Sequence, residues 1–345
     1  MFNYFTKDIG IDLGTANSLV YVKDRGIVIS EPSLAAINNK TNQVLAIGEE
    51  AKKMVGRTPA HITVIRPLLG GVISDFEMTE EMLRHFLRRV SSSRFMNYYR
   101  AVVGVPTNLT EVERKSVEDA VLSAGAAQAF LIEEPIAAAL GARLPIDEPM
   151  ANMVVDIGGG TTEVAVISMG GVVTARSIKV AGDKLNDDII KFIRDEYKLA
   201  IGEPTAEELK ITIASAIPLD ERLDLAIRGR DMATGLPREV IVKGTQIRAA
   251  IHRSLRLIVD AVKDVIETTP PELVGDVLRQ GIHLSGGGSL LRGIDALISR
   301  EVGVDVCVVE DPLTCVVRGA GVAAQNIGRY RNLFTFSPKP AEIAG

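Results

Sequence analysis

An aspartate and three consecutive glycines follow an apolar run in the segment MVVDIGGGTTEVAV, Met153 to Val166. Glycine loses much conformational entropy on folding and packs no side chain, so three in a row indicate a backbone that must come close to something. Two interpretations fit the pattern. One is a tight hairpin between two strands, and the other is a loop that cradles phosphate while Asp156 holds a metal ion. A single glycine-rich loop does not decide between them.

A second segment near the start of the chain has the same pattern. In IGIDLGTANSLVYV, Ile9 to Val22, an apolar run again leads to an aspartate, an apolar residue and a glycine. When Asp12 is aligned with Asp156, both segments carry Ser or Thr at the seventh place. This repeat indicates two related domains, each beginning with a hairpin whose tip carries an acid and a glycine. We therefore expect Asp12 and Asp156 to face each other and to bind Mg²⁺, the alternative for each being an Asx-turn at a hairpin tip.

Three further groups of residues can contribute to such a site. The run GIHLSGGGSLLRG is typical of a strand, a glycine loop and a helix, so the loop Ser285–Ser289 can offer N–H groups and a helix N-terminus to an anion. Glu133 and Glu134 end a buried strand, where one can take a proton from an attacking water; alternatively, both are solvated. Glu207 and Lys210 share a helix face, either as a surface ion pair or as groups that reach a ribose and a base.

Strands alternate with helices along the chain, which is typical of an α/β fold with a mixed sheet in each half. Strands are predicted at Ile9–Leu13, Ser18–Val22, Met153–Asp156, Glu163–Ser168 and Val172–Val180, among others. Helices are predicted within SDFEMTEEMLRHFLRRV (74–90), from a cap at Thr107 or Thr110 to Gly125, in the alanine-rich run after Pro135, and near Leu185–Lys198, Ala206–Ser215, Thr245–Glu267 and Pro271–Arg279.

Composition narrows the class of protein. The 345 residues are enough for two domains, each with its own core, and 46% hydrophobic with 24% charged residues is a soluble globular balance. A net charge of −5 and the absence of Trp argue against nucleic-acid binding. No apolar run is long enough to span a bilayer, and the start lacks a signal-peptide pattern. We expect Cys307 and Cys315 to be core residues, because two cysteines make neither a disulfide framework nor a zinc site.

Several motifs resemble those of known families. IDLGTAN, VVDIGGGTTEVAV, LIEEPIAAALGARLPI and LSGGGSLLRG resemble the phosphate and connecting motifs of the actin, heat-shock chaperone and sugar-kinase superfamily. Within it, ISEPSLAAI, GRTPAHITVIRPLLGGVISDFEMTEEML, VGVPTNLTEVERKSVEDA and TPPELVGDVLRQGIHLSGGG resemble the MreB family of bacterial actins, which sets rod shape. The resemblance runs from about Asp8 to Gly328.

The resemblance implies an actin-like ATPase fold: two related domains with RNase H-like mixed sheets, each with a smaller inserted lobe, around a nucleotide cleft. The expected boundaries are 1–32, 67–145 and 320–345 for the first large subdomain, 33–66 for its small lobe, 146–180 and 245–319 for the second large subdomain, and 181–244 for its small lobe.

The resemblance also implies a role for each matching position. Glu134 would activate the attacking water, and Thr161 would help to hold it. Asp12 and Asp156 would coordinate Mg²⁺, directly or through water. The implied nucleotide-binding residues are Gly14, Thr15, Ala16, Asn17, Gly158, Gly159, Gly160, Thr161, Gly182, Glu207, Lys210, Gly286, Gly287, Gly288 and Ser289.

The function so implied is that of an actin-like cytoskeletal ATPase. It would bind ATP or ADP with Mg²⁺, hydrolyse ATP to ADP and phosphate, and polymerise into membrane-associated filaments that organise cell-wall synthesis and set rod shape. Its partners would be further copies of itself in homopolymeric filaments of paired protofilaments, the inner face of the cytoplasmic membrane, and membrane proteins of the cell-elongation machinery. The protein would thus be cytoplasmic and peripheral at that membrane, and nucleic acid is not an expected partner.

Four residues are candidates for membrane contact. Phe2 and Phe5 lie three apart in the short segment MFNYFTKD, and Phe95 and Met96 lie in SSSRFMNYYR with arginines nearby. We expect all four to form one membrane-facing edge of the first domain. The alternative is that Phe95 and Met96 pack into the domain's own core.

Other members of the superfamily give rival functions. A sugar kinase shares the cleft but needs a sugar pocket, for which no motif stands out. A chaperone ATPase would continue into a substrate-binding domain. The divisome relative FtsA would carry a differently placed small lobe and a C-terminal amphipathic helix, whereas FTFSPKPAEIAG contains two prolines. The sequence therefore favours a filament-forming ATPase over these alternatives.

Overall fold

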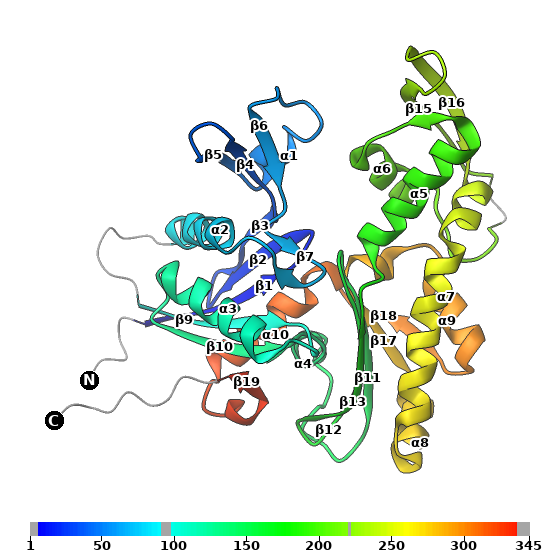
Figure 1. The fold of residues 1–345 in the computed structure, drawn as a ribbon. Coiled ribbons are helices and arrows are strands. Elements are labelled where there is room, and N and C mark those ends of the chain that lie inside the picture. The colour runs from blue at the N-terminus through cyan, green and yellow to red at the C-terminus, as the bar shows by residue number, and fades with distance from the viewer. Residues whose placement is uncertain (1–5, 91–97, 220–221, 337–345) are drawn as a thin grey trace.

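The structure is a computed structural model that describes residues 6–90, 98–219 and 222–336. Two halves lie side by side, each with a central sheet and a smaller lobe at the same end (Figure 1). The chain builds the first half, crosses to the second, and returns to the first through helix α10 (Cys315–Gln325). The two halves are therefore connected twice by the chain.

Each half is organised around one mixed sheet. The first sheet has the order β19-β10-β9-β1-β2-β3, with β1 (Thr6–Leu13), β2 (Asn17–Val22), β3 (Gly26–Pro32), β9 (Tyr98–Val105), β10 (Gln128–Glu133) and β19 (Phe334–Phe336). The second has the order β13-β12-β11-β17-β18, with β11 (Asn152–Ile157), β12 (Thr162–Ser168), β13 (Gly171–Ile178), β17 (Ile282–Ser285) and β18 (Val306–Val308).

The pairing of strands repeats between the halves. β1 is antiparallel to β2 and parallel to β9, and β11 is antiparallel to β12 and parallel to β17. Further out, β9–β10 and β17–β18 are both parallel, while β2–β3 and β12–β13 are both antiparallel. The turns that follow Asp12 and Asp156 therefore occupy equivalent places. The predicted repeat and the mixed sheet in each half are confirmed.

Helices cover both faces of the first sheet. α2 (Phe76–Val90) and α3 (Glu111–Ser123) pack on one face, and α4 (Glu134–Gly141) and α10 on the other. Because side chains alternate along a strand, Val103 of β9 joins the core under α2 and α3, whereas Val102 joins the core with α4 and α10. The latter core also takes Val154 and Ile167 from the second sheet, so α4 and α10 lie between the two sheets.

The remaining elements cover the second sheet and build the small lobes. α7 (Gly244–Thr268), α8 (Pro271–Gln280) and α9 (Ile294–Val302) pack on the second sheet. The first small lobe contains β4 (Ala35–Asn38), β5 (Gln43–Ile47), α1 (Glu49–Lys52) and β6 (Ile62–Ile65). The second contains α5 (Gly182–Tyr197), β14 (Leu199–Ala200), α6 (Glu203–Ile213), β15 (Asp224–Asp231) and β16 (Pro237–Lys243). The short elements are β7 (Leu68–Leu69), β8 (Val72–Ile73) and the 3₁₀ turns η1 (Gly287–Leu290), η2 (Pro312–Thr314) and η3 (Arg331–Leu333).

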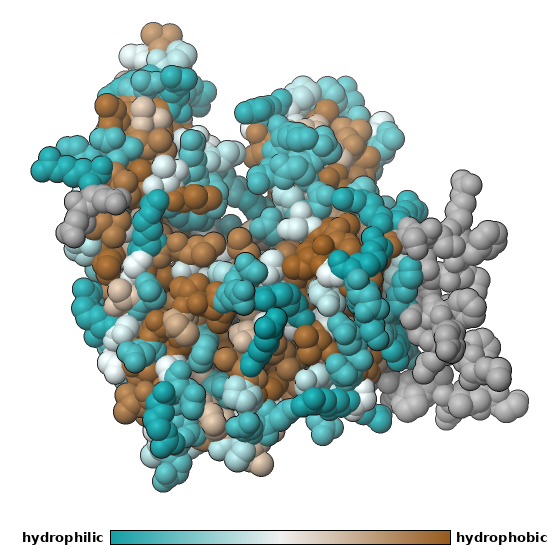
Figure 2. Space-filling view, turned by 180° about the vertical axis from the view of Figure 1, so that it is seen from behind, coloured by the Kyte–Doolittle hydropathy of each residue, from teal (hydrophilic) through white to brown (hydrophobic). Residues whose placement is uncertain are grey.

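The two small lobes are separate projections that an ion pair of Arg66 with Glu203 joins. From behind, they form separate projections above the body of the molecule, with a notch between them (Figure 2). The subdomain boundaries given above remain predictions.

Most predicted helices are present, with shifted ends. α2 begins at Phe76, two residues inside the predicted segment, and ends with it at Val90. α3 begins after Thr110, whose N–H donates to Glu113 at 2.8 Å while the Glu113 N–H donates back to the Thr110 hydroxyl at 3.3 Å. This capping box identifies Thr110, and not Thr107, as the cap. α5 and α6 begin at Gly182 and Glu203, three residues before their predicted starts. The prediction missed these first turns because they lack apolar residues at helical spacing.

Two predictions are wrong. The loop from Gly286 leads into the single 3₁₀ turn η1 and not directly into an α-helix. Glycine has a low helix propensity, so its glycines disfavour an α-helix at this point. Cys307 is exposed on β18, whereas Cys315 is buried as expected and donates its S–H to the Ala138 carbonyl oxygen at 3.1 Å.

Candidate functional site

A cavity of about 430 Å³ lies between the two halves, at the level of the two matched hairpin tips. Its walls come from both tips, from α4, from the starts of α5 and α10, from α6, and from the turns η1 and η2. The predicted site residues that line it are Asp12, Gly14, Thr15, Ala16, Asn17, Glu134, Asp156, Gly158, Gly159, Gly160, Thr161, Gly182, Glu207, Lys210, Gly286, Gly287 and Gly288. Segments far apart in the sequence thus meet at one cavity.

Two buried serines hold the first loop, between β1 and β2. The Ser33 hydroxyl donates to the Gly14 carbonyl oxygen at 2.6 Å and lies 2.8 Å from the Ser18 hydroxyl. Because the Ser33 proton is committed to Gly14, Ser18 is the donor to Ser33. The loop is therefore oriented by the protein itself. Nothing in the sequence singles out Ser33, which stands outside the loop motif.

Helix α5 holds the second loop, between β11 and β12. The N–H groups of Gly182 and Asp183 donate to the carbonyl oxygens of Gly158 and Gly159 at 3.1 and 2.8 Å. The first N–H groups of a helix have no partner within the helix, and here the loop supplies one. Within the loop, the Gly158 N–H donates to the Thr161 carbonyl oxygen at 2.9 Å. Gly182 thus lines the cavity because its helix begins against the loop.

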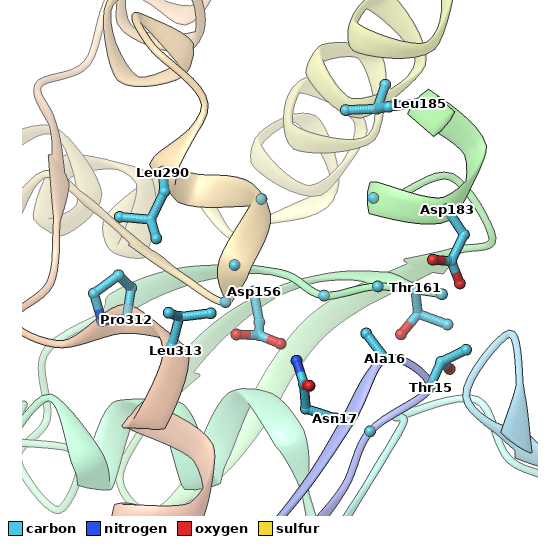
Figure 3. A pocket seen from close by; sticks show the side chains of 18 of the residues that line it. Thr15, Ala16, Asn17, Asp156, Thr161, Asp183, Leu185, Leu290, Pro312 and Leu313 are labelled. Carbon is cyan, nitrogen blue, oxygen red and sulfur yellow. The ribbon is translucent and has the colours of Figure 1, made fainter. Parts of the chain in front are cut away.

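The two loops approach each other closely, which explains the run of glycines. Figure 3 shows Thr15 and Ala16 of the first loop beside Thr161 of the second. A Cβ added to Gly159 would lie 2.7 Å from the Cβ of Ala16, and one added to Gly160 would lie 2.5 Å from the hydroxyl oxygen of Thr15. Side chains at these two positions would push the loops apart. The second loop is therefore both a hairpin tip and one wall of the cavity.

The two matched aspartates lie in this cavity in an environment that disfavours their charges. Burial raises the pKa of Asp12 to about 7, and the negative charge of Asp156 adds to this. Burial also raises the pKa of Asp156 to about 6, although the Ser285 hydroxyl donates to its Oδ1 at 2.6 Å. A divalent cation between the loops would relieve this cost.

The donor set suits a hard cation only with help from other oxygens. The described residues contain no group of three or more His, Cys, Asp or Glu side chains arranged to hold a metal ion. Two aspartates fit Mg²⁺, which usually keeps several waters and takes its remaining ligands from phosphate. Asp12 and Asp156 are the carboxylates that would bind it.

A third acid, Glu134, lies in the same cavity. It is the first residue of α4 and is buried, so the alternative of two solvated glutamates is wrong for this residue. Burial raises its pKa well above the usual value, and the charges of Glu163, Asp156 and Asp12 add to the rise. Its neighbour Glu133 ends β10 and does not line the cavity. Glu134 is thus the member of the pair that can reach a ligand.

The far end of the cavity carries a charged pair. Lys210 donates to Glu207 at 2.8 Å and to the Gly182 carbonyl oxygen at 3.0 Å, while the Asn186 amide donates to Glu207 at 2.7 Å. Although burial works against it, the Lys210 charge together with these hydrogen bonds holds the pKa of Glu207 below its usual value. Both side chains line the cavity, so they are not an ordinary surface pair.

An apolar wall completes the site, and the sequence analysis missed it. Leu290, Pro312 and Leu313 form this wall on one side of the cavity (Figure 3). Apolar residues at turns carry no chemical signature, so only the fold identifies them. Ser289 does not line the cavity: it is buried, and its hydroxyl donates to the Gly286 carbonyl oxygen at 2.6 Å. Its position fits a role in shaping the third loop.

Comparison with known proteins places the chain in a family. Residues 6–332 match the family model described as MreB/Mbl protein. The chain belongs to the MreB/Mbl family. It is 49% identical to the cell shape-determining protein Mbl of Bacillus subtilis over 325 residues, covering 94% of this chain and 98% of that protein. It is also 49% identical to the cell shape-determining protein MreB of Escherichia coli over 331 residues, covering 94% and 95%.

Solved structures of MreB-type proteins have the same fold. MreB5 of Spiroplasma citri bound to ADP is 40% identical and superposes with a TM-score of 0.90, covering 95% of this chain and 98% of that one. The same protein bound to AMPPNP gives 0.89. A MamK double helical filament is 22% identical with a TM-score of 0.80, which shows the shared fold alone. The actin-like fold expected from the sequence motifs is confirmed.

The four candidate membrane residues Phe2, Phe5, Phe95 and Met96 lie outside the described residues. Their predicted role therefore stays a prediction. Among the helices that the structure does describe, none combines the length and the apolar character needed to cross a bilayer.

Proposed function

We propose that this MreB/Mbl-family chain is an actin-like cytoskeletal ATPase that polymerises into filaments and determines cell shape. The observation that carries the proposal is the meeting of two pseudo-symmetric Asp–Gly loops with Glu134 in one cavity. Relatives that are named cell shape-determining proteins, and MreB5 structures with ADP and AMPPNP, support it.

The cavity divides into a phosphate end and a nucleoside end. Between the loops, backbone N–H groups would bind the phosphates, and Asp12 and Asp156 would hold Mg²⁺. The cation would neutralise charge on the phosphates. At the other end, Glu207 and Lys210 would bind the ribose and base, with the base against Leu290 and Leu313. ATP and ADP are the proposed ligands.

Hydrolysis would be the attack of water on the γ-phosphate in line with the bond that breaks. Glu134 would orient the water and accept its proton, and Thr161 would help to position it. Burial and the charges of the neighbouring acids favour the protonated form of Glu134, and a protonated carboxyl cannot accept a further proton. Positive charge bound by Asp12 and Asp156 would lower that pKa and so favour the carboxylate form, which can accept the proton.

The catalytic assignment is tested by two adjacent glutamates. Glu134→Ala should slow phosphate release from ATP by about a hundredfold and leave AMPPNP affinity almost unchanged, because a group that activates water acts mainly in the transition state. The measurement is phosphate release with Mg²⁺ and ATP, next to AMPPNP titration. Glu133→Ala is the matched control and should be the faster variant. The assignment fails if Glu133→Ala is the slower one. ATP consumption that depends on an added sugar would instead favour a sugar kinase.

The proposed partners begin with the chain itself, in homopolymeric filaments of paired protofilaments. The filaments would bind the inner face of the cytoplasmic membrane and contact membrane proteins of the cell-elongation machinery. Thr6 of β1 pairs with Tyr98 of β9, so the segments that hold Phe2 and Phe5, and Phe95 and Met96, enter neighbouring strands. This adjacency supports one membrane-facing edge. A filament would repeat that edge in every subunit, so many weak membrane contacts would act together.

The membrane contact is tested by co-sedimentation with liposomes that contain anionic lipid. A Phe95→Ser/Met96→Ser variant that still polymerises should bind them less than the wild type. Equal binding by both filaments would remove this loop from the mechanism and leave the N-terminal segment as the anchor.

A further inference from the structure

One buried acid beside the cavity has no role in the proposed chemistry. Glu163 is the second residue of β12 and is fully buried. In the first half, the equivalent position after the loop aspartate is Leu19, which is also buried. The repeated fold therefore accepts an apolar side chain at this place. The sheet alone does not explain a carboxylate there.

The Glu163 carboxylate accepts hydrogen bonds from both halves of the molecule. Its Oε2 accepts from the Thr107 N–H at 3.2 Å and from the Thr107 hydroxyl at 2.7 Å. Its Oε1 accepts from the hydroxyl of Ser177, its partner residue on β13. Thr107 belongs to the first half, and Ser177 to the second. The carboxylate thus bridges the two halves, with Thr107 as its partner in the first half.

On the first half, this bridge attaches beside Glu134. β9 and β10 are parallel neighbours, and their last residues, Val105 and Glu133, are paired. Thr107 lies two residues beyond Val105, and Glu134 directly follows Glu133. The strand ends that carry Thr107 and Glu134 therefore form one edge of the first sheet.

On the second half, the bridge attaches beside Thr161. Thr161 precedes Glu163 by two residues, at the point where the second loop enters β12. In the ladder with β11, Glu163 is paired with Asp156. Any shift of Glu163 relative to the first half would therefore move the second loop as well.

We propose that Glu163 is a positioning residue for ATP hydrolysis: its hydrogen bonds to Thr107 hold the wall that carries Glu134 in register with the wall that carries Thr161. This inference rests on the proposed ATPase activity. Glu163 does not line the cavity and acts through the two residues that do. The chemical step needs its reacting groups positioned to within about 1 Å, whereas binding tolerates larger displacements. Loss of the bridge should therefore affect the chemical step more than binding.

Four variants separate the bridge from the rest of the network. Thr107→Val keeps the side-chain shape and removes the shorter of the two hydrogen bonds across the halves, leaving only the longer one from the backbone N–H. Ser177→Ala is the matched control, because it removes a donor to the same carboxylate from within the second half. Glu163→Leu copies Leu19, and Glu163→Gln retains an oxygen that can accept from Thr107 and an amide that can donate to Ser177.

The experiment measures kcat and KM for phosphate release from ATP, AMPPNP affinity, and the thermal midpoint of each variant. We expect Thr107→Val and Glu163→Leu to lose about tenfold or more in kcat, with AMPPNP affinity changed by no more than about twofold. Ser177→Ala and Glu163→Gln should stay within about threefold of the wild type in kcat. Should Glu163→Leu fail to fold, Thr107→Val against Ser177→Ala decides the question.

Three results would overturn the inference. One is a Thr107→Val enzyme with wild-type kcat, and another is an equal loss in Ser177→Ala. The third is a loss in Glu163→Gln as large as in Glu163→Leu, which would show that charge matters and the bridge does not. A wild-type chain that binds AMPPNP but releases no phosphate would overturn the proposed function and this inference together, so the two failures are distinguishable.

Discussion

Three acids of the cavity, Asp12, Glu134 and Asp156, share one electrostatic property. Burial raises the pKa of each, and the negative charge of at least one neighbouring acid raises it further. The spacing of acids and glycines in the sequence indicated two of them as a pair. It did not indicate their environment, because that depends on contacts such as Ser33 with Gly14, which join segments outside the motifs. A cavity that disfavours its own charges is suited to a cationic ligand.

This property predicts how the stability of the nucleotide-free protein depends on pH. The pKa of Asp12 rises from 3.8 to about 7 in the folded state. The folded state therefore holds a proton that the unfolded chain has lost, and the free energy of unfolding falls as pH rises from about 4 to about 7. Asp12→Asn removes this loss of stability and should stabilise the nucleotide-free protein at pH 8 by about 1–2 kcal/mol. This is less than the free energy that corresponds to the whole pKa shift, because water reaches part of the carboxylate. Urea unfolding at pH 5 and pH 8 measures it.

The control for this prediction is an acid with the opposite shift. Hydrogen bonds from the Thr234 N–H, the Arg238 side chain and the Ala233 N–H lower the pKa of Asp231 to about 2. Its stabilisation is present above the unfolded pKa and is lost only as pH falls toward 2. Asp231→Asn should therefore destabilise the protein equally at pH 5 and pH 8. An Asp12→Asn effect that is the same at both pH values would contradict the assignment.

At the scale of elements, glycines set the distance between α4 and α10. A Cβ on Gly319 would lie 1.7 Å from the Ala137 carbonyl oxygen, and one on Gly141 would lie 1.9 Å from that of Cys315. These helices lie between the two sheets, so their spacing also sets the spacing of the halves. The sequence predicted an alanine-rich helix after Pro135, but its partner lies about 180 residues away and could not be inferred from periodicity.

The close approach predicts opposite effects of one substitution in two helices. Alanine favours helix over glycine by about 1 kcal/mol, so Gly275→Ala, on the exposed face of α8 with open space around it, should raise stability by up to that amount. Gly319→Ala should instead lower stability by about 1–3 kcal/mol, because the added methyl meets a backbone carbonyl. Urea unfolding of both variants checks the difference. Equal stabilisation by the two would show that α4 and α10 are less tightly packed.

At the scale of the whole molecule, the repeat predicted two related halves, and the paired sheets confirm them. The sequence predicted that the two hairpin tips face each other, but it could not predict the contacts that join the halves. They are joined by the core around α4 and α10, by the Glu163–Thr107 hydrogen bonds, and between the small lobes by an ion pair of Arg66 with Glu203. Each of these contacts joins residues that are distant along the chain, and neither partner carries a local signal. The cavity exists because these contacts bring the two loops together.

The central claim is that the chain is a filament-forming ATPase whose nucleotide binds between these loops, and we expect the bound nucleotide to promote its assembly. The most direct test is sedimentation of the wild type and of Asp156→Ala, with and without Mg²⁺ and ATP, after far-UV circular dichroism shows that both are folded. We predict that Mg²⁺ and ATP move the wild type into the pellet and leave Asp156→Ala in solution. Pelleting of Asp156→Ala at the wild-type level, or wild-type pelleting that does not depend on nucleotide, would contradict the claim.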